Sequence, residues 1–146
     1  MLIYHFGTRD RLVVEALREA RRRQRDVYDD ALKPRPGVAY ASVLKAAWPV
    51  MTAPESRPFL RLFGELHDLP AEQTPWAEFR TLSIRDWIPA IEAGLQSDNY
   101  PNATPLASAL VATARGLLSD LDTTGDDART SAAWKALIML VARETT

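Results

Sequence analysis

The sequence predicts an all-α protein that forms a single domain, and three observations carry this prediction. Apolar residues recur at three- and four-residue spacing along almost all of the 146 residues, which is the period of an amphipathic helix. Proline and glycine clusters divide this pattern, and no stretch shows the apolar–polar alternation of a half-buried strand. The length, with 47% hydrophobic and 25% charged residues, is ordinary for one globular domain.

The first predicted helix runs from Thr8 to Leu32. Thr8 is the expected N-cap, because its hydroxyl can accept a free backbone N–H of the first turn. Asp10 places negative charge at the positive end of the helix dipole. The helix should end at Leu32, since residues 33–37 read Lys-Pro-Arg-Pro-Gly and proline cannot continue it.

Five further helices are predicted. Their expected ranges are Val38–Trp48, Pro58–Leu69, Trp76–Gln96, Leu106–Leu121 and Asp126–Arg143. Proline interrupts two of them: Pro49 should end or kink the helix that precedes it, and Pro89 should kink its helix around residues 85–86.

Charge and composition exclude several classes of function. The chain has no cysteine, which rules out disulfides and thiolate chemistry. No apolar run reaches the roughly 18 residues of a membrane span, and charged residues follow the apolar opening at once, unlike a signal peptide. We therefore expect a cytoplasmic protein that contacts no membrane. Residues 1–36 carry nine Lys/Arg and six Asp/Glu (+3), and the rest carry nine and thirteen (−4), so the acidic remainder is a poor DNA-binding surface.

The arginine cluster at residues 21–25 is interpreted as a solvated helix face. Acidic residues lie four positions from three of these arginines, a spacing that allows ion pairs on a helix: Glu19 with Arg23, Arg22 with Asp26, and Arg25 with Asp29. Paired charge creates little net field, so a nucleic-acid or membrane patch is the less favoured interpretation.

The opening residues 2–12 carry the most specific motif, Leu-Ile-Tyr-His-Phe-Gly-Thr-Arg-Asp-Arg-Leu. Phe6 is expected to anchor a short helix against the long one, and Gly7 allows a tight turn between them. Tyr4, His5 and Arg9 carry donors that can hold backbone phosphates.

This run resembles the junction between the recognition helix and the following long helix in TetR-type transcription regulators, typically Leu-Tyr-x-His-Phe-x-Ser-Lys-Glu-x-Leu. Leu2, His5, Phe6 and Leu12 match that pattern, residues 8–10 are like-for-like replacements, and Ile3 stands where the family has tyrosine. Residues 57–66 are similar to the sixth helix of many members. Residues 106–143 are similar to their terminal helix pair.

The resemblance implies a six-helix ligand-binding and dimerisation domain at residues 8–146, preceded by a remnant of the DNA-binding headpiece at residues 1–7. With the complete headpiece, Tyr4, His5 and Arg9 would contact DNA phosphates, and the protein would bind its operator as a homodimer, as a repressor. The helix-turn-helix that reads bases is otherwise missing, so this chain alone should not read sequence. A bound effector would alter the spacing of the two headpieces.

The effector is expected to be small and apolar or amphipathic, in a pocket lined by aromatic and aliphatic side chains. The candidate ligand-binding residues are Trp48, Met51, Phe59, Phe63, His67, Phe79, Ser83, Trp87 and Thr113, with Arg115 as a further polar candidate. For many of these large apolar residues, plain core packing is the alternative.

The last two helices are expected to form the dimer interface. They are apolar on nearly all sides, so they should bury more than one face, and small residues such as Ala109 and Gly116 allow close approach. The candidate interface residues are Leu110, Val111, Leu117, Leu118, Leu121, Ala133, Leu137, Leu140 and Val141.

No enzyme motif, cofactor motif or metal constellation is recognised, so neither catalysis nor a cofactor is expected. His67 has only His5 as a second imidazole, too few for a typical transition-metal site. The run from Asp120 to Gly125 resembles the start of an EF-hand, but Ser131 stands where the closing glutamate is required. A stand-alone helical dimerisation module without a pocket is the main alternative, and a small helical enzyme is the other.

Overall fold

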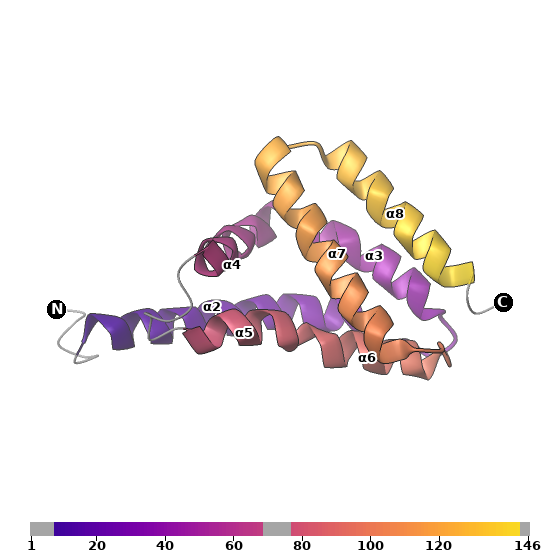
Figure 1. The fold of residues 1–146 in the computed structure, drawn as a ribbon, viewed down its shortest axis with the longest axis horizontal. Helices are drawn as coiled ribbons and strands as arrows, with labels where there is room; N and C mark the ends of the chain where they lie inside the picture. Colours follow the sequence, from indigo (N-terminus) through magenta and orange to yellow (C-terminus); the bar gives the residue numbers. More distant parts are fainter. Residues whose placement is uncertain (1–7, 69–76, 144–146) are drawn as a thin grey trace.

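The computed structural model describes residues 8–68 and 77–143, and within them every regular element is a helix (Figure 1). The elements are α2 (Arg9–Leu32), α3 (Tyr40–Thr52), the 3-10 turn η1 (Pro54–Ser56), α4 (Arg57–Asp68), α5 (Ala77–Arg85), α6 (Trp87–Ser97), α7 (Ala103–Thr124) and α8 (Asp127–Arg143). The all-α class is therefore confirmed for these residues. The six predicted helices are present, one of them divided into α5 and α6. Residues 1–7, with Tyr4 and His5, lie outside the described residues.

Helix α2 begins and ends where its caps predict. The Thr8 hydroxyl accepts a hydrogen bond from the backbone N–H of Arg11 at 3.2 Å, and Lys33 turns to extended backbone. The three predicted ion pairs form. The N–O distance is 2.7 Å between Arg23 and Glu19, 2.9 Å between Arg22 and Asp26, and 3.5 Å between Arg25 and Asp29.

Arg21 corrects the interpretation of a uniformly solvated arginine face. Only 7% of its surface is exposed, whereas Arg22 and Arg23 are exposed. The reason is helical period: position 21 falls on the stripe that α2 buries, four residues after Leu17 and seven before Tyr28.

Helix α3 continues past Pro49 to Thr52, so the predicted end at Trp48 is wrong. Proline removes the donor for the carbonyl one turn earlier, that of Lys45. Lys45 is exposed, so water can supply the missing hydrogen bond there. The Thr52 hydroxyl adds a hydrogen bond to the Trp48 carbonyl at 3.0 Å in the last turn.

Pro89 divides its helix as predicted. Helix α5 ends at Arg85, Asp86 is a turn residue, and α6 begins at Trp87. Because Pro89 has no N–H for the carbonyl of Arg85, the helical hydrogen bonds stop there. Asp86 and Trp87, the two residues at the break, both contact Arg21 of α2.

The helices pack around α7, which contacts α4, α6 and α8, while α3 lies against α2, α6 and α8. Figure 1 shows α5 and α6 running along the same side of the molecule as α2, with α4 on the other side of α7 from α8. One large apolar cluster joins α2, α3, α6, α7 and α8. Helix α4 packs on α2 through a separate, smaller cluster of Leu17, Phe63 and Leu66. Among the described helices, none is both long and apolar enough to cross a membrane.

Tyr40 fixes the centre of the large cluster. Its hydroxyl donates to the carbonyl of Leu32 at 3.0 Å, and its backbone N–H donates to the side chain of Asp98. Burial raises the pKa of Tyr40 far above its ordinary value, so the phenol stays protonated as a donor. Its ring lies against Gly94 of α6, where a Cβ would overlap the ring.

We predict that Gly94→Ala destabilises the protein by about 2–3 kcal/mol, because the added methyl overpacks the core against Tyr40. Gly64→Ala is the matched control: nothing lies within 4 Å of a Cβ at Gly64, and alanine favours a helix over glycine by about 1 kcal/mol. Urea unfolding followed by circular dichroism measures both. Equal stability of the two variants would contradict this packing.

Candidate functional site

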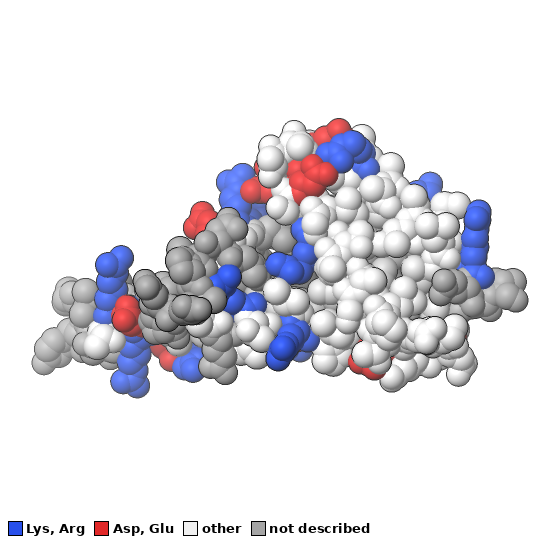
Figure 2. Space-filling view, in the orientation of Figure 1, with Lys and Arg blue, Asp and Glu red and all other residues white. Residues whose placement is uncertain are grey.

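A pocket of about 570 Å³ lies between α2, α4, α6 and α7. This volume is within the usual range for small-molecule sites. In Figure 2 the surface is hollowed between α4 and α7, and basic side chains lie along the hollow. The lining residues are Gln24, Tyr28, Met51, Phe59, Leu60, Arg61, Phe63, Gly64, Glu65, Ser83, Trp87, Ile91, Val111, Ala114, Arg115, Leu118, Ser119, Asp122 and Thr123.

The inner part of the pocket is apolar and aromatic. Tyr28 and Trp87 meet with ring centroids 5.5 Å apart at a tilted angle, an arrangement aromatic pairs favour. The Tyr28 hydroxyl donates to the carbonyl of Met51 at 3.4 Å, and burial raises its pKa, so it remains neutral. Phe63 and Ile91 complete this part. The arrangement suits the apolar body of a ligand.

Arg21 lies behind the aromatic wall and links α2 to three other helices, α4, α5 and α6. Its guanidinium carbon is 4.6 Å from the ring centroid of Trp87 and 5.8 Å from that of Phe63, both cation–π distances. It donates to Gln24 Oε1 at 2.6 Å, to the Leu82 carbonyl at 3.3 Å and to Asp86 Oδ2 at 3.3 Å. Burial lowers the pKa of Arg21, and the hydrogen bond to Asp86 opposes this effect. Arg21 thus attaches α2 to the break between α5 and α6.

The outer part of the pocket is polar and carries charge. Arg61 of α4 donates to Asp122 of α7 at 3.0 Å, which joins the two helices across the mouth. Glu65 is exposed. Arg115 is half-buried on the wall and makes no hydrogen bond or ion pair with any described residue. Burial lowers the pKa of Arg115, and no acidic group in the described part of the chain opposes this effect.

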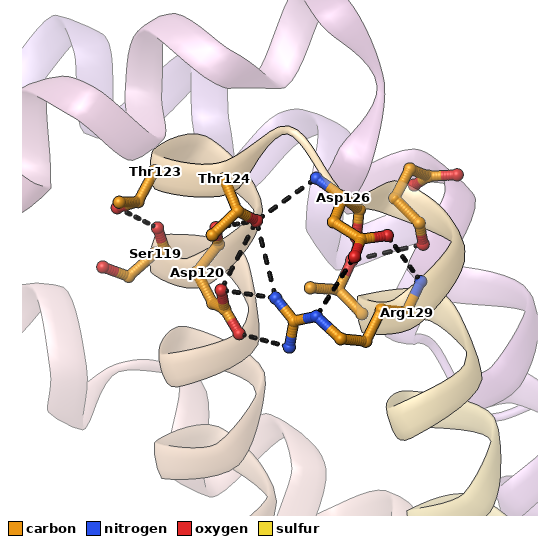
Figure 3. A network of polar contacts seen from close by, with 8 residues as sticks. Ser119, Asp120, Thr123, Thr124, Asp126 and Arg129 are labelled. Atoms are coloured by element: carbon orange, nitrogen blue, oxygen red, sulfur yellow. Dashed lines mark hydrogen bonds and ion pairs between the residues drawn. The ribbon is translucent and has the colours of Figure 1, made fainter.

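The turn between α7 and α8 holds a second polar cluster, drawn in Figure 3. Arg129 of α8 donates two hydrogen bonds to the Asp120 carboxylate, at 2.8 and 2.7 Å, and a third to Asp126 at 3.2 Å. The bond from Arg129 lowers the pKa of Asp120 below its ordinary value. Asp126 also accepts the backbone N–H of Arg129 at 3.1 Å and so caps α8.

In this arrangement, residues 120–124 belong to the end of α7, and Gly125 is its C-cap. The carboxylate of Asp120 is paired with Arg129 and that of Asp122 with Arg61, two partners that were not recognised from the sequence. Among the described residues, no group of three His, Cys, Asp or Glu side chains is placed to hold a metal ion.

The structure brings five of the sequence-predicted ligand residues to the pocket: Met51, Phe59, Phe63, Ser83 and Trp87. Arg115 lies there as well. The Ser83 hydroxyl donates to the carbonyl of Arg80 at 2.9 Å.

Three other predicted ligand residues are not on its wall, and the side chain of the fourth is not described. Trp48 lies in the core, where it stacks on Trp134 at 5.2 Å and donates to Ser131 at 2.8 Å. Phe79 packs on the small cluster beside Leu17, and Thr113 is exposed on α7. His67 belongs to α4, but its side chain lies outside the described part.

The pocket also uses residues that sequence reasoning missed. Gln24 and Tyr28 come from α2, for which no ligand contact was predicted. Asp122 and Val111 come from α7, which was considered mainly as an interface. One signal in the sequence could have indicated a ligand contact on α2: Gln24 is a polar residue within the apolar stripe of this helix.

The predicted dimer-interface residues fall into two groups. Leu110, Val111, Leu118, Leu121 and Val141 are buried inside the chain. Leu117 and Leu137 are half-buried, and Ala133 and Leu140 are exposed. An interface on α7 and α8 would therefore use the exposed neighbours of the buried group. Of the predicted DNA contacts, Arg9 is described: it is the first residue of α2 and is exposed.

Comparisons with models of known protein families, with curated proteins and with solved structures find no match to this chain.

We predict that Arg21→Met destabilises the protein by about 2–3 kcal/mol, because it leaves Asp86, Gln24 and a carbonyl without their common donor. The matched control is Arg22→Met on the same helix, whose exposed ion pairs contribute less than about 1 kcal/mol. Urea unfolding of both variants checks this. Should both variants match the parent protein, Arg21 does not join these helices as described.

Proposed function

We propose that this chain is the effector-binding and dimerising part of a TetR-type transcription regulator. The observation that supports this most is the pocket of about 570 Å³ whose wall includes α2. Helix α2 begins within the opening motif at residues 2–12, where the resemblance to the family is densest. A ligand in the pocket therefore touches the element that continues into the DNA-binding headpiece of such regulators.

In this proposal the ligand acts by selecting one orientation of α2. Gln24 and Tyr28 of α2 face the ligand together with residues of α4, α6 and α7. The ligand must bind two orientations of α2 with different affinities, because equal affinities shift no equilibrium. In a dimer, a change in the tilt of α2 alters the spacing of the headpieces and hence the fit to two half-sites on DNA.

Homodimerisation through α7 and α8 is the second part of the proposal. Their exposed face is rich in small and apolar residues, and Met139 and Leu140 expose 52% and 60% of their surface. The other members of this face are Ala109, Ala112, Gly116, Ala132, Ala133 and Ala136. Figure 2 shows few charged side chains over these helices away from the turn that joins them. Small residues let helices of two subunits approach closely, and two-fold dimers are the commonest oligomers.

Binding of N-phenyl-1-naphthylamine, an uncharged dye that fluoresces in apolar surroundings, tests the pocket. We expect saturable binding of one dye per chain. Gly64→Trp should abolish it, because Gly64 lines the pocket and has open space where the indole would go. Arg57→Trp is the control on the same helix, exposed and away from the lining. Binding that survives Gly64→Trp would place the dye elsewhere and remove the support for an effector site here.

Light scattering at micromolar concentration tests the dimer. We expect about twice the chain mass of 16.3 kDa. Ala136→Arg, which puts a charge on the exposed face of α8, should give monomers, since an unpaired charge in an interface is costly. Ala39→Arg, exposed at the start of α3, should leave the dimer intact. A monomeric parent protein would contradict this part of the proposal.

A further inference from the structure

Four charged side chains of the described residues line the pocket, and Arg115 differs from the other three. Arg61 and Asp122 neutralise each other at 3.0 Å. Glu65 is exposed, so water solvates its carboxylate. Arg115 is half-buried and has neither an ion pair nor a hydrogen bond with any described residue. A partly desolvated cation with no counter-ion among the described residues is unfavourable, and an anion supplied by a ligand relieves this cost.

The position of Arg115 on α7 separates it from the nearest acid of its own helix. Asp120, the nearest acid, lies five residues further on, about 7.5 Å along the axis, and is paired with Arg129. Asp122 lies seven residues further on, about 10 Å along the axis, and is paired with Arg61. On α7 the lining is apolar around Arg115, at Val111, Ala114 and Leu118, and polar beyond it, from Ser119 onward. Arg115 therefore stands where the apolar inner part of the pocket meets its polar mouth.

A second cation lies behind the apolar part. Arg21 is within 4.6 Å of the Trp87 ring centroid, on a wall whose indole also lines the pocket. Arg21 shares the carboxylate of Asp86 with Arg25, at 3.3 and 3.6 Å. No carboxylate lines the inner part of the pocket, among the residues that the structure describes.

We infer that the ligand of this pocket is an amphipathic organic acid. Its apolar or aromatic body would lie against Phe63, Trp87 and Met51. Its single carboxylate or sulfonate would accept hydrogen bonds from the Arg115 guanidinium, whose planar fork fits such groups. This inference rests on the proposed effector-binding function and narrows it from apolar ligands in general to anionic ones.

Two dyes with the same aromatic skeleton test the inference: 8-anilinonaphthalene-1-sulfonate and the uncharged N-phenyl-1-naphthylamine. Fluorescence titration of the full chain should show that the sulfonate binds at least about tenfold more tightly. Arg115→Gln should weaken the sulfonate about tenfold and leave the uncharged dye within about twofold. Arg115→Lys, which keeps the charge, should recover part of the loss. Arg35→Gln, in the exposed loop between α2 and α3, should change neither affinity.

The outcomes separate the inference from the function on which it rests. Unchanged affinity of the uncharged dye in Arg115→Gln also shows that the variant is folded. If both dyes bind equally and Arg115→Gln affects neither, the anionic ligand is wrong while the pocket stands. If neither dye binds the parent protein, the proposed effector site fails and the inference fails with it.

Discussion

The attachment of Arg21 to Trp87 and Asp86 is the constraint on which the rest of the structure depends. Helix α2 contacts the large apolar cluster only through its second half, and α4 packs on it through a separate small cluster. Between these regions, one guanidinium stacks on Trp87 and binds the carbonyl and carboxylate presented by the break between α5 and α6. That break exists because Pro89 ends the hydrogen bonding of α5. The break after Arg85 thus lies beside the acceptors that hold α2.

The same attachment gives the pocket its character. Trp87 presents one face to Arg21 and also lines the pocket, so the position of α2 and the shape of the apolar wall depend on each other. Across the pocket, α7 contributes Arg115 between apolar and polar surroundings. In the proposed regulator, a ligand that orders the aromatic wall would shift the orientation of α2. The size of this shift would be limited by the difference in the ligand's affinity for the two arrangements.

Local signals predicted the helices well, because caps, prolines and helical spacing act over a few residues. Thr8, Pro89 and the ion pairs of α2 are examples. The pocket was predicted only in part, since periodicity identifies which face is buried but not whether another side chain fills the space beyond it. Trp48 is an example. Its indole donates to Ser131 and stacks on Trp134 in the core, and both partners lie more than eighty residues further along the chain. The burial of Arg21 was not predicted, because the arginine cluster was interpreted from its ion pairs, whereas the position of Arg21 on the buried stripe of α2 determines its exposure.

Because the chain contains no cysteine, a single spin label can report directly on the central claim that pocket occupancy sets the orientation of α2. Arg11→Cys places the label on the exposed first turns of α2, and pulsed electron resonance measures the label-to-label distance across the dimer. The account predicts a shifted or narrowed distance distribution when 8-anilinonaphthalene-1-sulfonate saturates the pocket. An identical distribution with the pocket empty and with it demonstrably filled would contradict it.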